Sequence, residues 1–213
     1  MYNTILFDLD GTLTDPGLGI TNSVMYALKK WNIEVSDRTE LYKFIGPPLL
    51  DSFATFYGFD EKRCAEALVF YREYFREKGI YENTLYKGIP EMLARLKANG
   101  KRVILATSKP EEFAKIILAH FSIDGYFDFA AGASMDETRN TKADVIGYAL
   151  ESCGITDTSN VLMVGDRKHD VIGAKQFNID TVGVLYGYGD LEELQRAGAK
   201  YIAETVEDIF KFT

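Results

Sequence analysis

The stretch Ile5-Leu6-Phe7-Asp8-Leu9-Asp10-Gly11-Thr12-Leu13 places three apolar residues directly before two aspartates that stand one residue apart. The apolar run is typical of a strand buried on both faces, as in the centre of a parallel sheet. Asp8 and Asp10 would leave that strand at its carboxyl end, where open α/β sheets bind ligands. Two buried carboxylates this close together are unfavourable unless a cation neutralises them. The motif therefore indicates a site that holds a divalent metal.

The segment behind this strand has a helical pattern. Apolar residues recur at helical spacing over 18–31, again between Pro48 and Gly58, and over 61–78, where Gly79 ends the run. We therefore expect residues 16–82 to form a small α-helical cap domain inserted after the first strand.

From about residue 84 the pattern alternates between helix and strand. Apolar strands are expected at 102–106, 127–131, 161–164 and 181–185, with helices between them. Right-handed crossovers would stack these elements into a three-layer α/β/α, Rossmann-like core around a parallel sheet. The sequence thus predicts an α/β protein whose catalytic core comprises residues 1–15 and 83–213.

Polar residues follow three of the expected strands. Asp8 and Asp10 follow the first, Thr107 and Ser108 follow the second, and Asp166 follows a later one with Asp170 four positions on. Each fragment alone has a simpler explanation, because aspartate and threonine are common in turns and at helix N-caps. Parallel strands end at one edge of the sheet, however, so the three groups are expected to converge there.

Composition limits the partners and the compartment. The chain has 213 residues and a formal charge of −8, which argues against a nucleic acid or an anionic membrane as partner. No apolar run approaches the roughly 20 residues needed to cross a bilayer. Cys64 and Cys153 lack metal-ligand spacing, so we expect a reduced, cytoplasmic protein.

These motifs together resemble the haloacid dehalogenase superfamily of phosphotransferases. Asp8-Leu9-Asp10-Gly11-Thr12, Thr107 after an apolar strand, a basic residue before a helix, and Gly165-Asp166-Arg167-Lys168-His169-Asp170 occur in the family's order. The chain is most similar to its phosphoglycolate phosphatase and 5′-nucleotidase-like group, which carries small helical caps. The resemblance implies a phosphatase that hydrolyses a small phosphorylated metabolite, with phosphoglycolate or a nucleoside 5′-monophosphate as substrate.

The resemblance also implies roles for the aspartates. Asp8 would be the nucleophile that forms an aspartyl-phosphate, and Asp10 would protonate the leaving group and then activate water. Asp8, Asp166, Asp170 and the backbone carbonyl of Asp10 would surround Mg²⁺, which prefers oxygen ligands.

The phosphate-binding residues implied by the resemblance are Gly11, Thr107, Ser108 and a lysine. Lys142, which opens an expected helix, fits the usual position of that lysine, although the Lys-Pro context of many relatives is missing here. Lys109, in Thr107-Ser108-Lys109-Pro110, is the alternative.

Other functions within and outside the family remain open at this point. Asp10 disfavours a dehalogenase, which lacks an acid at that position, but a sugar-phosphate mutase keeps both acids. A non-enzymatic receiver-like domain also combines an acidic cluster with a threonine and a lysine, yet it would not carry a 60-odd-residue helical insert. We expect an enzyme that is a monomer or a weak homodimer.

Overall fold

Six strands form one sheet in the order β5-β4-β1-β6-β7-β8. Each neighbouring pair runs parallel. The strands are β1 (Thr4–Phe7), β4 (Arg102–Pro110), β5 (Phe129–Ala133), β6 (Val161–Gly165), β7 (Asp180–Val184) and β8 (Tyr201–Ala203). The α/β prediction with a parallel sheet is confirmed.

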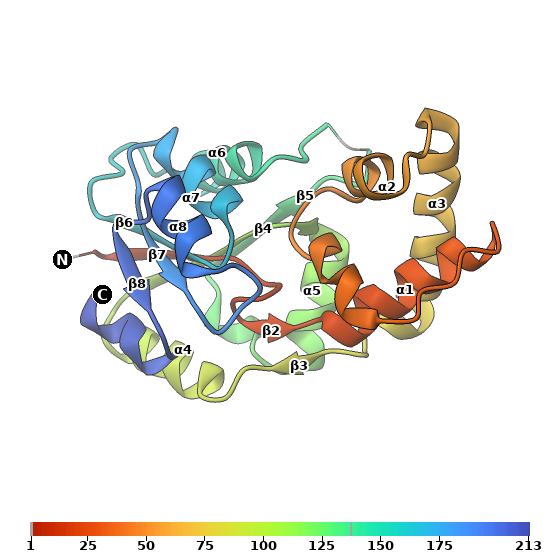
Figure 1. Cartoon of the computed structure of the whole chain (residues 1–213). Coiled ribbons are helices and arrows are strands. Elements are labelled where there is room, and N and C mark those ends of the chain that lie inside the picture. Colours follow the sequence, from red (N-terminus) through yellow and green to blue (C-terminus); the bar gives the residue numbers. More distant parts are fainter. Residues whose placement is uncertain (1, 137) are drawn as a thin grey trace. The chain divides into compact units, whose positions relative to one another are not determined.

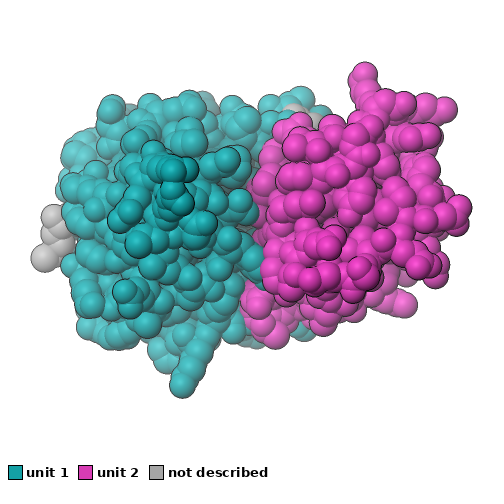
Figure 2. Space-filling view, in the orientation of Figure 1, with its two compact units in different colours: residues 1–14, 85–213 teal, residues 15–84 magenta. Residues whose placement is uncertain are grey.

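The computed structural model describes residues 2–136 and 138–213. The chain divides into two compact units, residues 1–14 with 85–213 and residues 15–84, which are coloured separately in Figure 2. It passes between them in two short paired strands, β2 (Thr14–Asp15) and β3 (Thr84–Leu85). The sheet of six strands lies in the first unit.

Helices cover both faces of this sheet. The helices of the first unit are α4 (Ile89–Ala98), α5 (Glu111–His120), α6 (Lys142–Ser152), α7 (Lys168–Lys175) and α8 (Leu191–Ala197). Leu6, Ile104 and Met163 point to one face, where they pack with Val145 and Ile146 of α6. In Figure 1, α6 and α7 lie on this side of the sheet and α4 lies on the other. This is the expected three-layer arrangement.

The strand order explains where a site can form. β1 has β4 on one side and β6 on the other, so the direction of winding changes at β1, and ligands of such sheets bind at that point. Phe7 is in register with Leu105 of β4 and Val164 of β6. The residues after these three positions therefore reach the same edge of the sheet.

The strand β4 differs most from its expected length. The sequence predicts a strand over 102–106, but β4 continues to Pro110. Its pairing with β5 shifts near the end: Thr107 is opposite Gly132, whereas Pro110 is opposite the next residue, Ala133. Two extra residues thus form a bulge, and periodicity does not reveal one because it depends on the partner strand.

The second unit is helical. It contains α1 (Gly17–Lys29), α2 (Leu49–Tyr57) and α3 (Glu61–Tyr74), with a 3₁₀ helix at Arg38–Phe44 and a π-helical turn at Phe75–Gly79. The sequence predicts the three α-helices but not the 3₁₀ helix, whose single buried leucine and phenylalanine give too short an apolar pattern.

None of the helices among residues 2–136 and 138–213 combines the length with the apolar character that crossing a membrane requires.

Candidate active site

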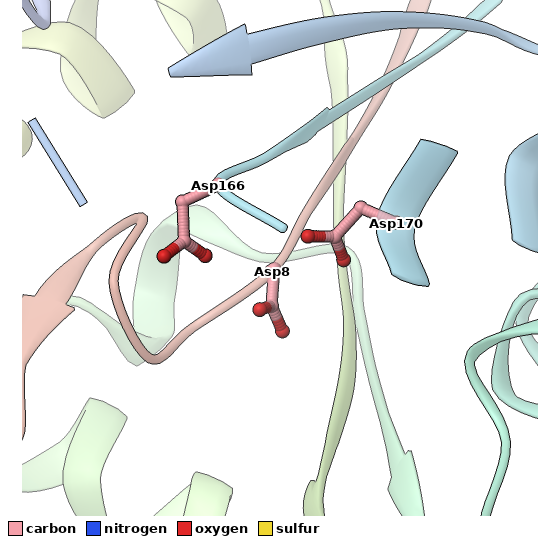
Figure 3. Close-up of side chains that lie close together, drawn as sticks. All are labelled: Asp8, Asp166 and Asp170. Carbon is pink, nitrogen blue, oxygen red and sulfur yellow. The ribbon is translucent and has the colours of Figure 1, made fainter. Parts of the chain in front are cut away.

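Three buried aspartates meet at the carboxyl edge of the sheet. Asp8 follows β1, Asp166 follows β6, and Asp170 lies in the first turn of α7. One carboxylate oxygen of each lies within 4.8 Å of the others, and Figure 3 shows the three side chains close together. The structure therefore brings together residues that are 158 positions apart in the sequence (166 − 8).

Asp166 is held by neutral donors. The backbone N–H of Tyr188 donates to its Oδ2 at 2.8 Å, and the Thr12 hydroxyl donates to its Oδ1 at 3.4 Å. Burial raises the pKa of Asp166 well above its usual range, and the charges of Asp170 and Asp8 raise it further. The fold thus places a carboxylate where its ionised form is disfavoured unless a cation approaches.

Gly11 makes room for this carboxylate. Its φ is +82°, in the left-handed region, and a Cβ atom at this position would lie 2.1 Å from Oδ2 of Asp166. Both the backbone conformation and the close approach therefore require glycine.

Asp170 is also strained electrostatically. Its Oδ2 accepts a hydrogen bond from the backbone N–H of Arg167 at 3.0 Å. Burial raises the pKa of Asp170 to about 6, because this effect and the charge of Asp8 outweigh the opposing charge of Lys142. Without a metal, the Asp170 carboxyl group therefore loses its proton at a higher pH than an ordinary aspartate does.

Lys142 lies between two of the aspartates. Thr141 caps the N-terminus of α6 in a capping box with Asp144, and this fixes the start of the helix at Lys142. The Lys142 Nζ lies 2.7 Å from Oδ1 of Asp8 and 2.7 Å from Oδ1 of Asp170. Burial alone would lower the pKa of Lys142, but the two carboxylates outweigh it and raise the pKa. The side chain is a permanent buried cation.

Asp10 faces a second buried lysine. The Lys109 Nζ lies 2.7 Å from Oδ2 of Asp10, and the two side chains are 5% and 12% exposed. Burial raises the pKa of Asp10, and the charge of Lys109 opposes that rise. Both lysines considered from the sequence thus lie in the site, but on different carboxylates.

The remaining predicted residues lie at the end of β4. Thr107 is buried, and its Oγ1 accepts a hydrogen bond from the backbone N–H of Lys109 at 3.2 Å. Ser108 is the next residue and is half-buried. Their roles in phosphate binding stay predictions.

The acidic cluster fits a hard divalent cation. Its three side chains offer only carboxylate oxygens, the ligand type that Mg²⁺ prefers. The raised pKa values of Asp166 and Asp170 show carboxylates whose charge is incompletely compensated in the protein alone. The carboxylate of Asp10 is directed to Lys109, so a contribution from Asp10 would come from its backbone carbonyl, as the resemblance implies.

Sequence reasoning missed the loop that holds Asp166. The backbone N–H of Tyr188 donates to that carboxylate, and the glycines on either side of Tyr188 lie close to Asp166. A Cβ on Gly187 would lie 2.4 Å from Cβ of Asp166. A Cβ on Gly189 would lie 1.9 Å from the carbonyl oxygen of Asp166. The only signal was the Gly-Tyr-Gly triplet shortly after a strand, which also reads as an ordinary turn.

Replacing Asp166 by asparagine should stabilise the metal-free protein. Asp166→Asn removes a buried charge but keeps an oxygen for the Tyr188 N–H. In EDTA we expect the melting temperature to rise by about 2–4 °C, the shift that about 1 kcal/mol gives in a protein of this size. Thermal melting followed by circular dichroism measures it.

Asp8→Asn is the matched control. The charge of Asp8 is paired with Lys142, so its removal should leave the melting temperature unchanged or lower it. A lower melting temperature for Asp166→Asn than for the wild type would contradict the view that Asp166 is electrostatically strained.

Comparison with known proteins agrees with this geometry. The family model described as haloacid dehalogenase-like hydrolase matches residues 5–184. The 5′-nucleotidase of Pseudomonas aeruginosa is 47% identical over 194 residues, which cover 91% of this chain and 87% of that protein. The phosphoglycolate phosphatase of Colwellia psychrerythraea is 29% identical over an alignment that covers 96% of this chain and 94% of that protein.

A solved structure extends the similarity to three dimensions. The crystal structure of a predicted phosphatase from Clostridium acetobutylicum superposes with a TM-score of 0.96 at 49% identity, covering 99% of this chain and 97% of that one. The expected enzyme class is confirmed: the chain is a phosphatase and belongs to the haloacid dehalogenase-like hydrolase family.

Proposed function

We propose that this phosphatase depends on Mg²⁺ and hydrolyses a small phosphomonoester through an aspartyl-phosphate on Asp8. The observation that carries the proposal is the pairing of two neighbouring carboxylates with separate buried lysines. Asp8 lies against Lys142, and Asp10 lies against Lys109. Two carboxylates held apart in this way can take different parts in one reaction.

The proposed reaction has two steps. In the first, a carboxylate oxygen of Asp8 attacks phosphorus, and the bond to the leaving oxygen breaks while Asp10 gives that oxygen a proton. In the second, Asp10 takes a proton from water as the water oxygen attacks phosphorus. The bond between Asp8 and phosphorus then breaks, which releases inorganic phosphate and restores Asp8 as a carboxylate and Asp10 as a carboxylic acid.

Positive charge is what such a site needs most. A carboxylate that attacks a phosphate dianion meets strong repulsion, and Lys142 lies 2.7 Å from the attacking group. Asp8, Asp166, Asp170 and the backbone carbonyl of Asp10 would hold Mg²⁺, which would supply further charge stabilisation and orient the phosphate. Thr107 and Ser108 are proposed to donate hydrogen bonds to the phosphoryl oxygens. Gly11 would lie beside the phosphate, but its backbone N–H donates to the carbonyl oxygen of Thr14 at 2.7 Å.

A nucleoside 5′-monophosphate is the substrate class that we propose first. The P. aeruginosa 5′-nucleotidase shares 47% identity with this chain, against 29% for the C. psychrerythraea phosphoglycolate phosphatase. Phosphoglycolate is therefore second. The proposed partner is a small phosphorylated metabolite rather than a nucleic acid, because the net charge is −8. The monomer or weak homodimer and the cytoplasmic location stay predictions.

Phosphate release from a panel of phosphomonoesters tests the substrate and the metal together. With Mg²⁺ we expect higher kcat/KM for nucleoside 5′-monophosphates than for phosphoglycolate. EDTA should abolish release, Mg²⁺ should restore it, and Ca²⁺ should inhibit, because calcium takes more ligands in a looser geometry. Full activity in excess chelator would remove the metal from the proposal. Transfer of phosphate to another sugar hydroxyl without net release would favour the mutase alternative.

Asp8→Asn tests the covalent mechanism. An amide at this position cannot attack phosphorus, so we expect turnover below about 1% of the wild-type rate. The control is Asp124→Asn, which changes an exposed aspartate and should retain full activity. Turnover of Asp8→Asn at several per cent or more would exclude Asp8 as the nucleophile.

Lys142→Ala tests the lysine that neutralises the phosphoryl group. Loss of one preorganised charged donor costs about 3–4 kcal/mol, so kcat/KM should fall by a few hundred-fold on every substrate. Lys142→Arg should not restore it, because the buried ammonium group lies 2.7 Å from both Asp8 and Asp170, and a planar guanidinium does not reproduce that compact geometry. The exposed Lys62→Ala is the control. If Lys142→Ala keeps nearly normal kcat/KM while Lys109→Ala loses kcat/KM on every substrate, the phosphate-binding role belongs to Lys109.

A further inference from the structure

Lys109 is a second buried cation that the reaction described above does not use. It is 8% exposed, and lysine is rarely buried to this degree unless it is paired. Its partner is Oδ2 of Asp10, at 2.7 Å. The other lysine of the site is engaged elsewhere, with Asp8 and Asp170. The nucleophile and the acid–base group thus each have a cation of their own.

The backbone is built to bring Lys109 to this place. Ser108 and Lys109 are the two extra residues of the β4 bulge, since Thr107 and Pro110 are opposite consecutive residues of β5. Bulges of this kind redirect a side chain beside an active site. The Lys109 N–H donates to Oγ1 of Thr107 at 3.2 Å and so fixes the turn of the chain.

The partner strand is adapted to the bulge. Gly132 of β5 is opposite its start, and a Cβ on Gly132 would lie 2.7 Å from the carbonyl oxygen of Lys109 and 2.5 Å from Cα of Glu111. No real side chain tolerates such contacts, so the bulge requires a glycine across from it.

The two oxygens of Asp10 differ in their surroundings. Oδ2 faces the Lys109 ammonium group. Oδ1 is buried and accepts no hydrogen bond from any of residues 2–136 and 138–213. A carboxylate otherwise rotates with little preference about its last side-chain bond. An ion pair at one oxygen therefore selects an orientation that leaves the other oxygen for a reaction partner.

We infer that Lys109 is the positioning residue of the acid–base group: its ion pair with Oδ2 holds Asp10 so that Oδ1 meets the leaving oxygen and then the attacking water. This inference rests on the proposed function. The proton passes between Oδ1 and the leaving oxygen in the first step and between water and Oδ1 in the second, while Lys109 keeps its own proton throughout. Lys109 touches no reacting atom, and it acts only through Asp10.

Two other roles for Lys109 predict different kinetics. A lysine that binds the phosphoryl group would matter equally for every phosphomonoester. A lysine that only fills space in the core would affect stability and leave the kinetics unchanged. A lysine that positions a general acid matters only where the leaving oxygen needs a proton, and this dependence on the leaving group distinguishes the three roles.

The experiment compares an alkyl phosphate, the preferred substrate of the panel, with 2,4-dinitrophenyl phosphate, whose leaving group departs without protonation. Lys109→Met keeps the length of the side chain and removes the charge. We expect kcat/KM of this variant to fall at least 100-fold on the alkyl phosphate, the scale of general acid catalysis. On the dinitrophenyl ester it should stay within about threefold, and a burst of dinitrophenolate should precede slow turnover because activation of water is also impaired.

Asp10→Asn is the benchmark, and a double mutant completes the test. Since Lys109 acts through Asp10, adding Lys109→Met to Asp10→Asn should cause no further loss on the alkyl phosphate. Lys142→Ala is the contrasting control, with losses on both substrates. Equal losses of Lys109→Met on the two esters, no loss on either, or additive losses in the double mutant would each overturn the inference.

Two further variants keep the test decisive if Lys109→Met does not fold. Lys109→Gln retains a donor near Oδ2 and should lose less on the alkyl phosphate than Lys109→Met. Lys109→Leu, which also replaces the charge by an apolar side chain, should show the same selective loss as Lys109→Met. A loss on both esters in these variants would again overturn the inference. If instead Asp10→Asn itself shows no dependence on the leaving group, the proposed function fails rather than the role of Lys109.

Discussion

The ion pairs between buried lysines and buried aspartates are the interaction on which the rest of the site depends. Two unit charges 4 Å apart interact by about 4 kcal/mol at an effective dielectric constant of 20. Asp8, Asp166 and Asp170 bring carboxylate oxygens within 4.8 Å of one another, so their mutual repulsion is of this order for each ionised pair. Lys142 relieves it by lying between two of them, at 2.7 Å from each. Lys142 therefore offsets part of the repulsion between the carboxylates at this edge of the sheet.

The charge balance also explains why the site suits a divalent cation. Asp8, Asp10, Asp166 and Asp170 carry four negative charges when ionised, and Lys109 and Lys142 carry two positive ones, which leaves −2 (2 − 4). One Mg²⁺ would bring the cluster to neutrality before an anionic substrate arrives. The missing positive charge affects Asp166 most, because its hydrogen-bond donors are a backbone N–H and a hydroxyl rather than a lysine.

Much of this arrangement could be predicted from the sequence because it depends on local patterns. The apolar composition of Ile5-Leu6-Phe7 is enough to predict a buried strand. The aspartates that follow it must then lie at the carboxyl edge of the parallel sheet. The alternation of helices and strands fixes the order in which further polar residues reach that edge. Lys142 is found because it opens a helix whose capping box is local.

What the sequence leaves undetermined depends on contacts between distant segments. The end of β4 cannot be read from β4 itself, because the bulge exists only in the pairing of Thr107 and Pro110 with β5. For the same reason the pattern Thr107-Ser108-Lys109-Pro110 does not determine where Lys109 lies. It is equally consistent with an exposed lysine at the edge of the sheet and with a lysine in a buried ion pair. The choice between the two lysines, posed from the sequence as one role with two candidates, changes once the bulge is known. The structure gives each lysine a carboxylate of its own, and the question becomes which step of the reaction each cation serves.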